Sequence, residues 1–127
     1  MLADLDSISR RCGVWPHAVL TAHSHTYQRY TRTVKTMKIP YVVAGNGGYR
    51  IGPVLPGADK AIGKQVQPKL DNVRFEAFDA EHYGFLRVIV DERRLRIEYQ
   101  PVSGDNADAV TVDLKSRKLA RNAGRNG

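Results

Sequence analysis

His23 and His25 are the residues of this sequence whose type and spacing best fit metal-dependent chemistry. Both follow the mostly apolar run 17–22, where a buried strand would leave a regular sheet. Neutral imidazole is a common ligand for zinc, iron and related ions, so two such side chains separated by one residue can both reach a metal centre. The H-x-H spacing also fits two polar loop residues with hydrogen-bonded rings. Taken alone, the spacing leaves both interpretations open.

The residues that follow the histidines favour the metal interpretation. Tyr27 and Arg29 lie just downstream, and the apolar run 40–44 ends at the Gly-rich turn 45–48. This order resembles the calcineurin-like metallophosphoesterase superfamily, in particular its purple acid phosphatase-like branch. The late motif of that branch is an apolar strand, G-H-x-H, a Tyr, an Arg and a downstream strand that closes on a Gly-rich turn.

The resemblance covers about residues 5 to 114. Residues 83–88 are similar to the closing strand of the family, and Ala22 stands where the family usually has Gly. The resemblance implies that residues 1–114 are the C-terminal half of a four-layer α/β/β/α sandwich of the α+β class. It further implies hydrolysis of phosphate esters by a hydroxide bound to two divalent or trivalent metal ions of the iron, zinc or manganese type.

Motif matching, position by position, implies that His23 ligates one metal and His25 the other. No catalytic residue beyond these ligands is implied. Asn46 fits either the mouth of a pocket or a turn-forming residue before two glycines. The residues expected to line the pocket or brace the loop are Tyr27, Arg29, Asn46, Gly47 and Gly48.

The remaining motifs of the superfamily, D-x-H, G-D-x-x-D and G-N-H-D, do not precede the histidines. Residues 104–108 spell G-D-x-x-D, but they come late and fit a hairpin loop, while His17 and His82 fit structural positions. We therefore expect a fragment that is inactive alone and lacks an N-terminal half. Loss of that half predicts an exposed apolar sheet face and self-association.

The distribution of charge supports an alternative hypothesis, in which the chain is a binding module and not an enzyme. The 127 residues carry a net charge of +7, of which the acid-free segment 115–127 contributes five basic residues. We expect this tail to be disordered. A non-catalytic basic β-domain could bind nucleic acid or an acidic partner through it, although the tail lacks stacking aromatics, which disfavours nucleic acid. A purely structural β-domain is a third hypothesis, in which replacing both motif histidines changes nothing.

Length and composition exclude several protein classes. The chain fits one domain, because domains commonly contain about 100–200 residues. Cys12 is the single cysteine, which excludes intrachain disulfides and cysteine-based zinc clusters. The sequence shows neither a signal peptide nor an apolar run of membrane-spanning length, so we expect a soluble, cytoplasmic protein.

Local patterns predict the elements that position these residues. Helical spacing of apolar residues predicts a short N-terminal helix that ends at Gly13, and 51–72 has the Pro- and Gly-rich composition of a surface loop. Four segments with period-two alternation predict an antiparallel meander with one buried face between residues 73 and 114. Before them, buried strands are expected within 17–22 and 40–44, and residues 27–34 suit a strand or an extended loop.

Overall fold

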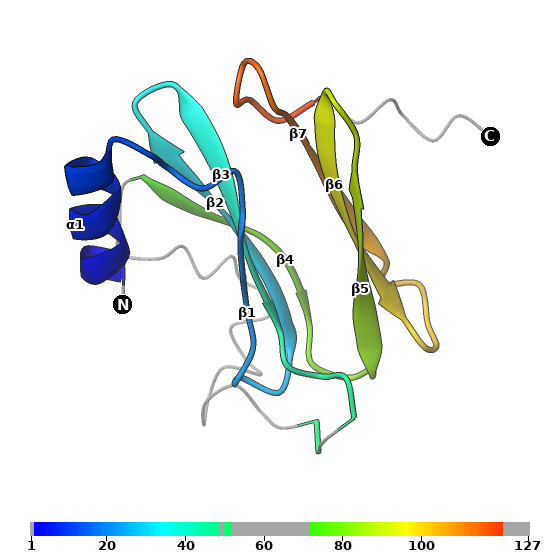
Figure 1. The fold of residues 1–127 in the computed structure, drawn as a ribbon. Helices are drawn as coiled ribbons and strands as arrows, with labels where there is room; N and C mark the ends of the chain where they lie inside the picture. The colour runs from blue at the N-terminus through cyan, green and yellow to red at the C-terminus, as the bar shows by residue number, and fades with distance from the viewer. Residues whose placement is uncertain (1, 49, 52–71, 121–127) are drawn as a thin grey trace.

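The computed structural model describes residues 2–48, 50–51 and 72–120, and within them the chain forms one helix and seven strands (Figure 1). It is mostly β, with a short N-terminal helix, which is compatible with the expected α+β class. The predicted loop 51–72 lies almost wholly outside the described residues. The elements are α1 (Leu2–Cys12), β1 (Val19–Thr21), β2 (Tyr27–Val34), β3 (Met37–Ala44), β4 (Val73–Asp79), β5 (Gly84–Val90), β6 (Arg94–Pro101) and β7 (Asp108–Asp113).

Helix α1 confirms the predicted N-terminal helix. Asp4 in its first turn and Arg10 and Arg11 in its last turn complement the helix dipole. Gly13 follows with φ of 69°, the left-handed conformation that commonly ends a helix. No helix in the described part of the chain is long and apolar enough to span a membrane.

The polar side of α1, rather than its apolar stripe, docks onto the protein. Asp6 and Ser9 are buried, whereas Ile8 is 55% exposed and Cys12 is also exposed. Arg32 on β2 donates two hydrogen bonds of 2.5 Å to the Asp6 carboxylate. A buried, bidentate ion pair therefore fixes the helix on the sheet, and helical periodicity could not reveal this partner.

The first sheet has the strand order β1-β3-β2-β4. β1 runs parallel to β3, while β2 pairs antiparallel with both β3 and β4. β1 is shorter than the predicted strand 17–22 and forms an edge of the sheet. Leu20 at its centre is 47% exposed, so the prediction that this strand is buried is wrong. An apolar run does not reveal whether a neighbouring strand covers it.

The second sheet has the strand order β5-β6-β7 with antiparallel pairing. The four predicted strands between residues 73 and 114 all exist, but the single meander is wrong. β4 pairs with β2 in the first sheet, with a register shift between Arg29 and Tyr30. Period-two alternation identifies a strand but not its neighbour, and the turn after Asp79 carries the chain from one sheet to the other.

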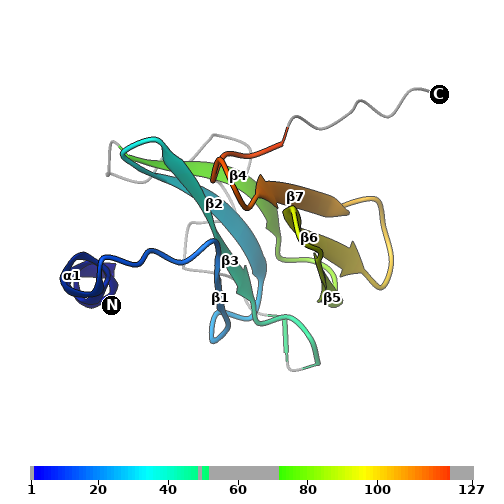
Figure 2. The same cartoon turned by 45° about the horizontal axis from the view of Figure 1, so that its top comes forward.

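The core lies between the two sheets. Tyr27 and Val42 of the first sheet pack with Ile97, Tyr99 and Val110 of the second sheet. The Tyr27 and Tyr99 rings stack at a centroid distance of 3.9 Å with an angle of 4° between their planes. Figure 2 shows α1, the first sheet and the second sheet as three successive layers.

The beginning of the basic tail belongs to the fold. Leu119 forms a bridge with Val112, and Arg117 donates hydrogen bonds of 2.7 and 2.6 Å to the carbonyls of Trp15 and Pro16. The boundary predicted after residue 114 is therefore too early, because backbone hydrogen bonds hold residues 115–120 against β7 and β3 and the Arg117 guanidinium binds the segment before β1. Residues 121–127 lie outside the described part of the chain.

Candidate functional site

The two histidines lie where the parallel strands β1 and β3 both end. The loop after β1 carries His23 and His25, and the loop after β3 carries the turn 45–48 (Figure 1). Carboxyl ends of parallel strands meet at the same edge of a sheet, so the two segments are brought together by the strand pairing. We refer to residues 22–26 as the His loop.

Gly45 holds the His loop against the end of β3. Its N–H donates a 3.1 Å hydrogen bond to the carbonyl of Thr26. A Cβ atom at position 45 would lie 1.9 Å from the carbonyl oxygen of Ser24. Only glycine permits this close backbone approach, so Gly45 fixes the path of the chain between the two histidines.

Side-chain hydrogen bonds brace the other side of the His loop. Gln28 Nε2 donates a 2.9 Å bond to the Thr26 hydroxyl, and the Tyr30 hydroxyl donates a 2.7 Å bond to Gln28 Oε1. The Ser24 and Thr26 hydroxyls lie 3.2 Å apart. Thr26 and Gln28 are both buried, which makes this side of the loop a firm support.

The two histidines on this support differ in exposure. His23 is exposed and has φ of 83°, a left-handed conformation that is uncommon for a residue other than glycine. His25 is half-buried. Strained backbone conformations of this kind tend to occur at functional sites.

Tyr27 and Arg29 converge on an acidic residue that motif reading had assigned to a hairpin loop. Arg29 Nε and Nη2 donate to the two carboxylate oxygens of Asp108 at 2.6 and 3.0 Å, and the Tyr27 hydroxyl donates to Oδ2 at 2.6 Å. Burial acts to raise the pKa of Asp108, but the hydrogen bonds from Arg29 and Tyr27 outweigh it and lower the pKa. Burial raises the pKa of Tyr27, with the Asp108 carboxylate acting in the same direction. These contacts join β2 to β7 beneath the His loop.

Asn46 is fully buried and links the two sheets, instead of facing a pocket mouth. Its Nδ2 donates to the Tyr99 hydroxyl at 2.7 Å and to the His82 carbonyl at 2.8 Å. Tyr99 in turn donates to Asp79 at 3.1 Å. Burial raises the pKa of Tyr99 to about 12. Gly47 and Gly48 follow as exposed turn residues.

The remaining histidines lie in structural surroundings. His82 Nδ1 is 3.2 Å from both oxygens of the buried Asp79, whose carboxylate also accepts the backbone N–H groups of Glu81 and His82. Burial acts to raise the pKa of Asp79, but these hydrogen bonds outweigh it and lower the pKa. His17 lies in a bend before β1.

The donor set of the described residues does not complete a dinuclear metal centre. No group of three or more His, Cys, Asp or Glu side chains suited to a metal occurs within the described residues. A two-metal site needs a bridging carboxylate and several ligands for each ion, whereas the His loop offers two imidazoles. A dinuclear centre at the His loop would therefore need ligands from outside the described residues.

Sequence reasoning did not identify Gly45, Asp108 or Tyr99 as supports of the site. Gly45 carried a usable signal, because a glycine directly after an apolar strand often marks a close backbone approach. Asp108 and Tyr99 carried none, because their partners lie far away in the sequence and pair through the tertiary fold.

Comparison of the chain with protein-family models, with curated proteins and with solved structures found no match.

Proposed function

We propose that this chain is the histidine-bearing, C-terminal part of a metal-dependent phosphoesterase. The observation that carries the proposal is the geometry of the His loop. An exposed histidine, His23, and a half-buried one, His25, stand on a loop that Gly45 and Thr26 hold in place, and His23 has a left-handed backbone. The matching order of Tyr27, Arg29 and the Gly-rich turn supports the assignment to phosphate esters. The isolated chain is expected to be inactive because the D-x-H, G-D-x-x-D and G-N-H-D blocks do not precede its histidines.

The arrangement of layers supports an incomplete four-layer sandwich. α1, the first sheet and the second sheet form three layers, and within residues 2–48, 50–51 and 72–120 β1 and β5 are edge strands on the same side of the molecule (Figure 2). Exposed apolar side chains occur on both edges: Leu20, Phe85, Val88, Ile89 and Val90. A second polypeptide segment that adds strands to these edges would cover them.

The free edge of β1 also explains how such a segment would reach the histidines. A strand added parallel to β1 would end at the same edge of the sheet as β1 itself. Acidic or histidine residues following that strand would then lie near His23. The segment that covers the open edges and the segment that supplies the missing ligands are therefore proposed to be the same one.

The test is to measure Zn²⁺ binding by the tag-free chain with isothermal titration calorimetry. We expect the wild type to bind weakly. The His23→Ala/His25→Ala variant should bind with at least about tenfold lower affinity, because both ligands are removed. His17→Ala serves as the matched control, because His17 lies outside the His loop, and should bind like the wild type.

Equal binding by the wild type and the double variant would show that the ligand assignment is wrong.

Sequencing of the DNA upstream of the Met1 codon tests the second part of the proposal. An in-frame segment with D-x-H, G-D-x-x-D and G-N-H-D blocks is expected, and p-nitrophenyl phosphate hydrolysis should appear when that segment is joined to this chain.

The basic-tail hypothesis gains no support from the tail residues that are described. Arg117 is engaged by two backbone carbonyls, and Leu119 packs at the margin of the core. The described part of the tail thus contributes Arg117 and Leu119 to the fold.

A further inference from the structure

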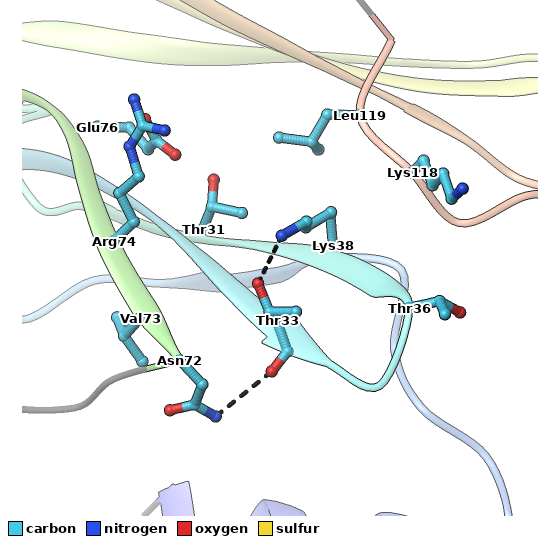
Figure 3. Close-up of a pocket in the computed structure, with 10 residues that line it drawn as sticks. All are labelled: Thr31, Thr33, Thr36, Lys38, Asn72, Val73, Arg74, Glu76, Lys118 and Leu119. Atoms are coloured by element: carbon cyan, nitrogen blue, oxygen red, sulfur yellow. Dashed lines mark hydrogen bonds and ion pairs between the residues drawn. The ribbon is translucent and has the colours of Figure 1, made fainter.

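A pocket of about 640 Å³ lies beside the hairpin between β2 and β3, whereas the His loop precedes the other end of β2. Figure 3 shows the lining residues of the pocket. Its wall combines the inner face of the first sheet with the segment after β7. The pocket is of the size that commonly holds a small ligand. The lining residues used below are Thr31 and Thr33 of β2, Lys38 of β3, Arg74 and Glu76 of β4, and Lys118.

Thr31 supplies a buried polar group without a partner. Its side chain is 6% exposed, and its hydroxyl oxygen has no hydrogen-bond partner in the described part of the chain. Figure 3 shows the hydroxyl pointing away from β2, into the space between Glu76 and Leu119. A buried hydroxyl left unpaired costs free energy, so this one is suited to a ligand that fills the space.

Lys38 supplies a charge beside this hydroxyl. Its ammonium donates a 2.8 Å hydrogen bond to Thr33 Oγ1 and points into the pocket (Figure 3). Among the described residues, no carboxylate lies within ion-pair distance of Lys38. The ammonium has three N–H donors, so after its bond to Thr33 it keeps donor capacity for a ligand.

The sum of charges favours an anion. Arg74 and Lys118 add positive charge at the rim, and Glu76, which lies 3.4 Å from Arg74, is the single acidic residue among the lining residues. The Lys38 ammonium and the threonine hydroxyls line this space and the Arg74 guanidinium lies at its rim, a set of donors that matches the acceptor oxygens of a phosphoryl group.

We propose that this pocket binds a small phosphate-type oxyanion through Lys38, Thr31 and Arg74. The volume exceeds that of inorganic phosphate, which leaves room for the organic group of a phosphomonoester. The site is separate from the His loop, because it lies near the other end of β2 and shares no residue with it. The inference therefore does not depend on the metal-site proposal.

The experiment is calorimetric titration of the full chain with sodium phosphate at constant ionic strength. We expect saturable binding to the wild type, at least about tenfold weaker binding to Lys38→Met, and a smaller loss for Thr31→Val. Thr31→Val keeps the shape of the side chain, so it remains a usable test of the pocket if Lys38→Met fails to fold. Lys115→Gln is the control, since it removes an exposed basic residue outside the pocket.

Parallel titrations with glycerol 3-phosphate and with chloride identify the ligand. Tighter binding of glycerol 3-phosphate than of phosphate would assign the pocket to phosphomonoesters, and equal binding would assign it to the free ion. The proposal is overturned if chloride competes at the same concentration, if Lys115→Gln weakens binding as much as Lys38→Met, or if folded Lys38→Met or Thr31→Val binds like the wild type.

Discussion

At the scale of single residues, Asp108 joins the two sheets. It accepts hydrogen bonds from Arg29 and Tyr27, and the side chains of Arg29 and Asp108 are only 11% and 19% exposed. A charge buried to this extent lowers stability unless an opposite charge pairs with it. Either residue without its partner would therefore destabilise the folded protein. The His loop stands at the beginning of the strand that carries Tyr27 and Arg29, and the ion pair thus supports the candidate site from below.

Replacing Asp108 by Asn should therefore destabilise the protein strongly. We expect the free energy of unfolding to fall by about 3 kcal/mol at pH 7, because Arg29 is left without its counter-charge. Urea titrations measure this difference. Asp105→Asn is the matched control in the same loop region, and its exposed position predicts a change within about 0.5 kcal/mol.

The pH dependence of that loss follows from the lowered pKa of Asp108. The carboxylate contributes stability above its ordinary pKa of 3.8 and loses it as the pH falls through the lower value of the folded protein. The difference between wild type and Asp108→Asn should therefore shrink below about pH 4. A difference that stays constant down to pH 2 would show that charge is not its cause.

At the scale of elements, the parallel pairing of β1 with β3 creates the site. It brings the His loop and the turn after β3 to one edge, where Gly45 contacts the backbone of Ser24. The loop is thus shaped by a contact between two segments about 20 residues apart, in addition to its own hydrogen bonds.

Gly45→Ala should displace the His loop. The added methyl group would meet the Ser24 carbonyl, so we expect a loss of about 2 kcal/mol in stability and weaker Zn²⁺ binding. Gly48→Ala is a close control, since a Cβ there meets nothing within 4 Å and should change stability by less than about 0.5 kcal/mol. Thermal unfolding and Zn²⁺ titration of both variants provide the comparison. Equal stability and equal Zn²⁺ affinity of the two variants would show that Gly45 does not hold the His loop in place.

At the scale of the whole molecule, β1 and β5 are edge strands on one side, with no further strand paired to them among the described residues. β5 presents an unpaired edge, and Phe85, Val88, Ile89 and Val90 are 44–65% exposed. Exposed apolar edge strands pair readily with other chains. In the absence of a covering segment, this side is expected to drive association between copies of the chain.

Val88→Lys should reduce this association. A charge in the middle of β5 opposes strand pairing, and we expect the association constant to fall at least about tenfold. Sedimentation velocity over a range of protein concentrations measures it. Val102→Lys is the control, because Val102 is 74% exposed but lies outside the strands. A wild-type chain that remains monomeric at all concentrations would contradict the prediction.

Local patterns were sufficient to predict the N-terminal helix, the existence of the strands and the turn after β3. These features depend on side-chain periodicity and on glycine, both of which act over a few residues. The order of His23, His25, Tyr27 and Arg29 was likewise readable, and its chemical interpretation remains a proposal.

Which strands became neighbours could not be read from those patterns. The alternation that predicted β4 is the same whether it pairs with β2 or with β5, and the apolar run containing Leu20 gave no sign that β1 forms an edge. Pairing depends on hydrogen bonds and burial between segments distant in the chain, such as Arg29 with Asp108 and Asn46 with Tyr99. Local sequence therefore specified the histidines and their strand, while long-range packing placed them on a braced loop at an incomplete edge.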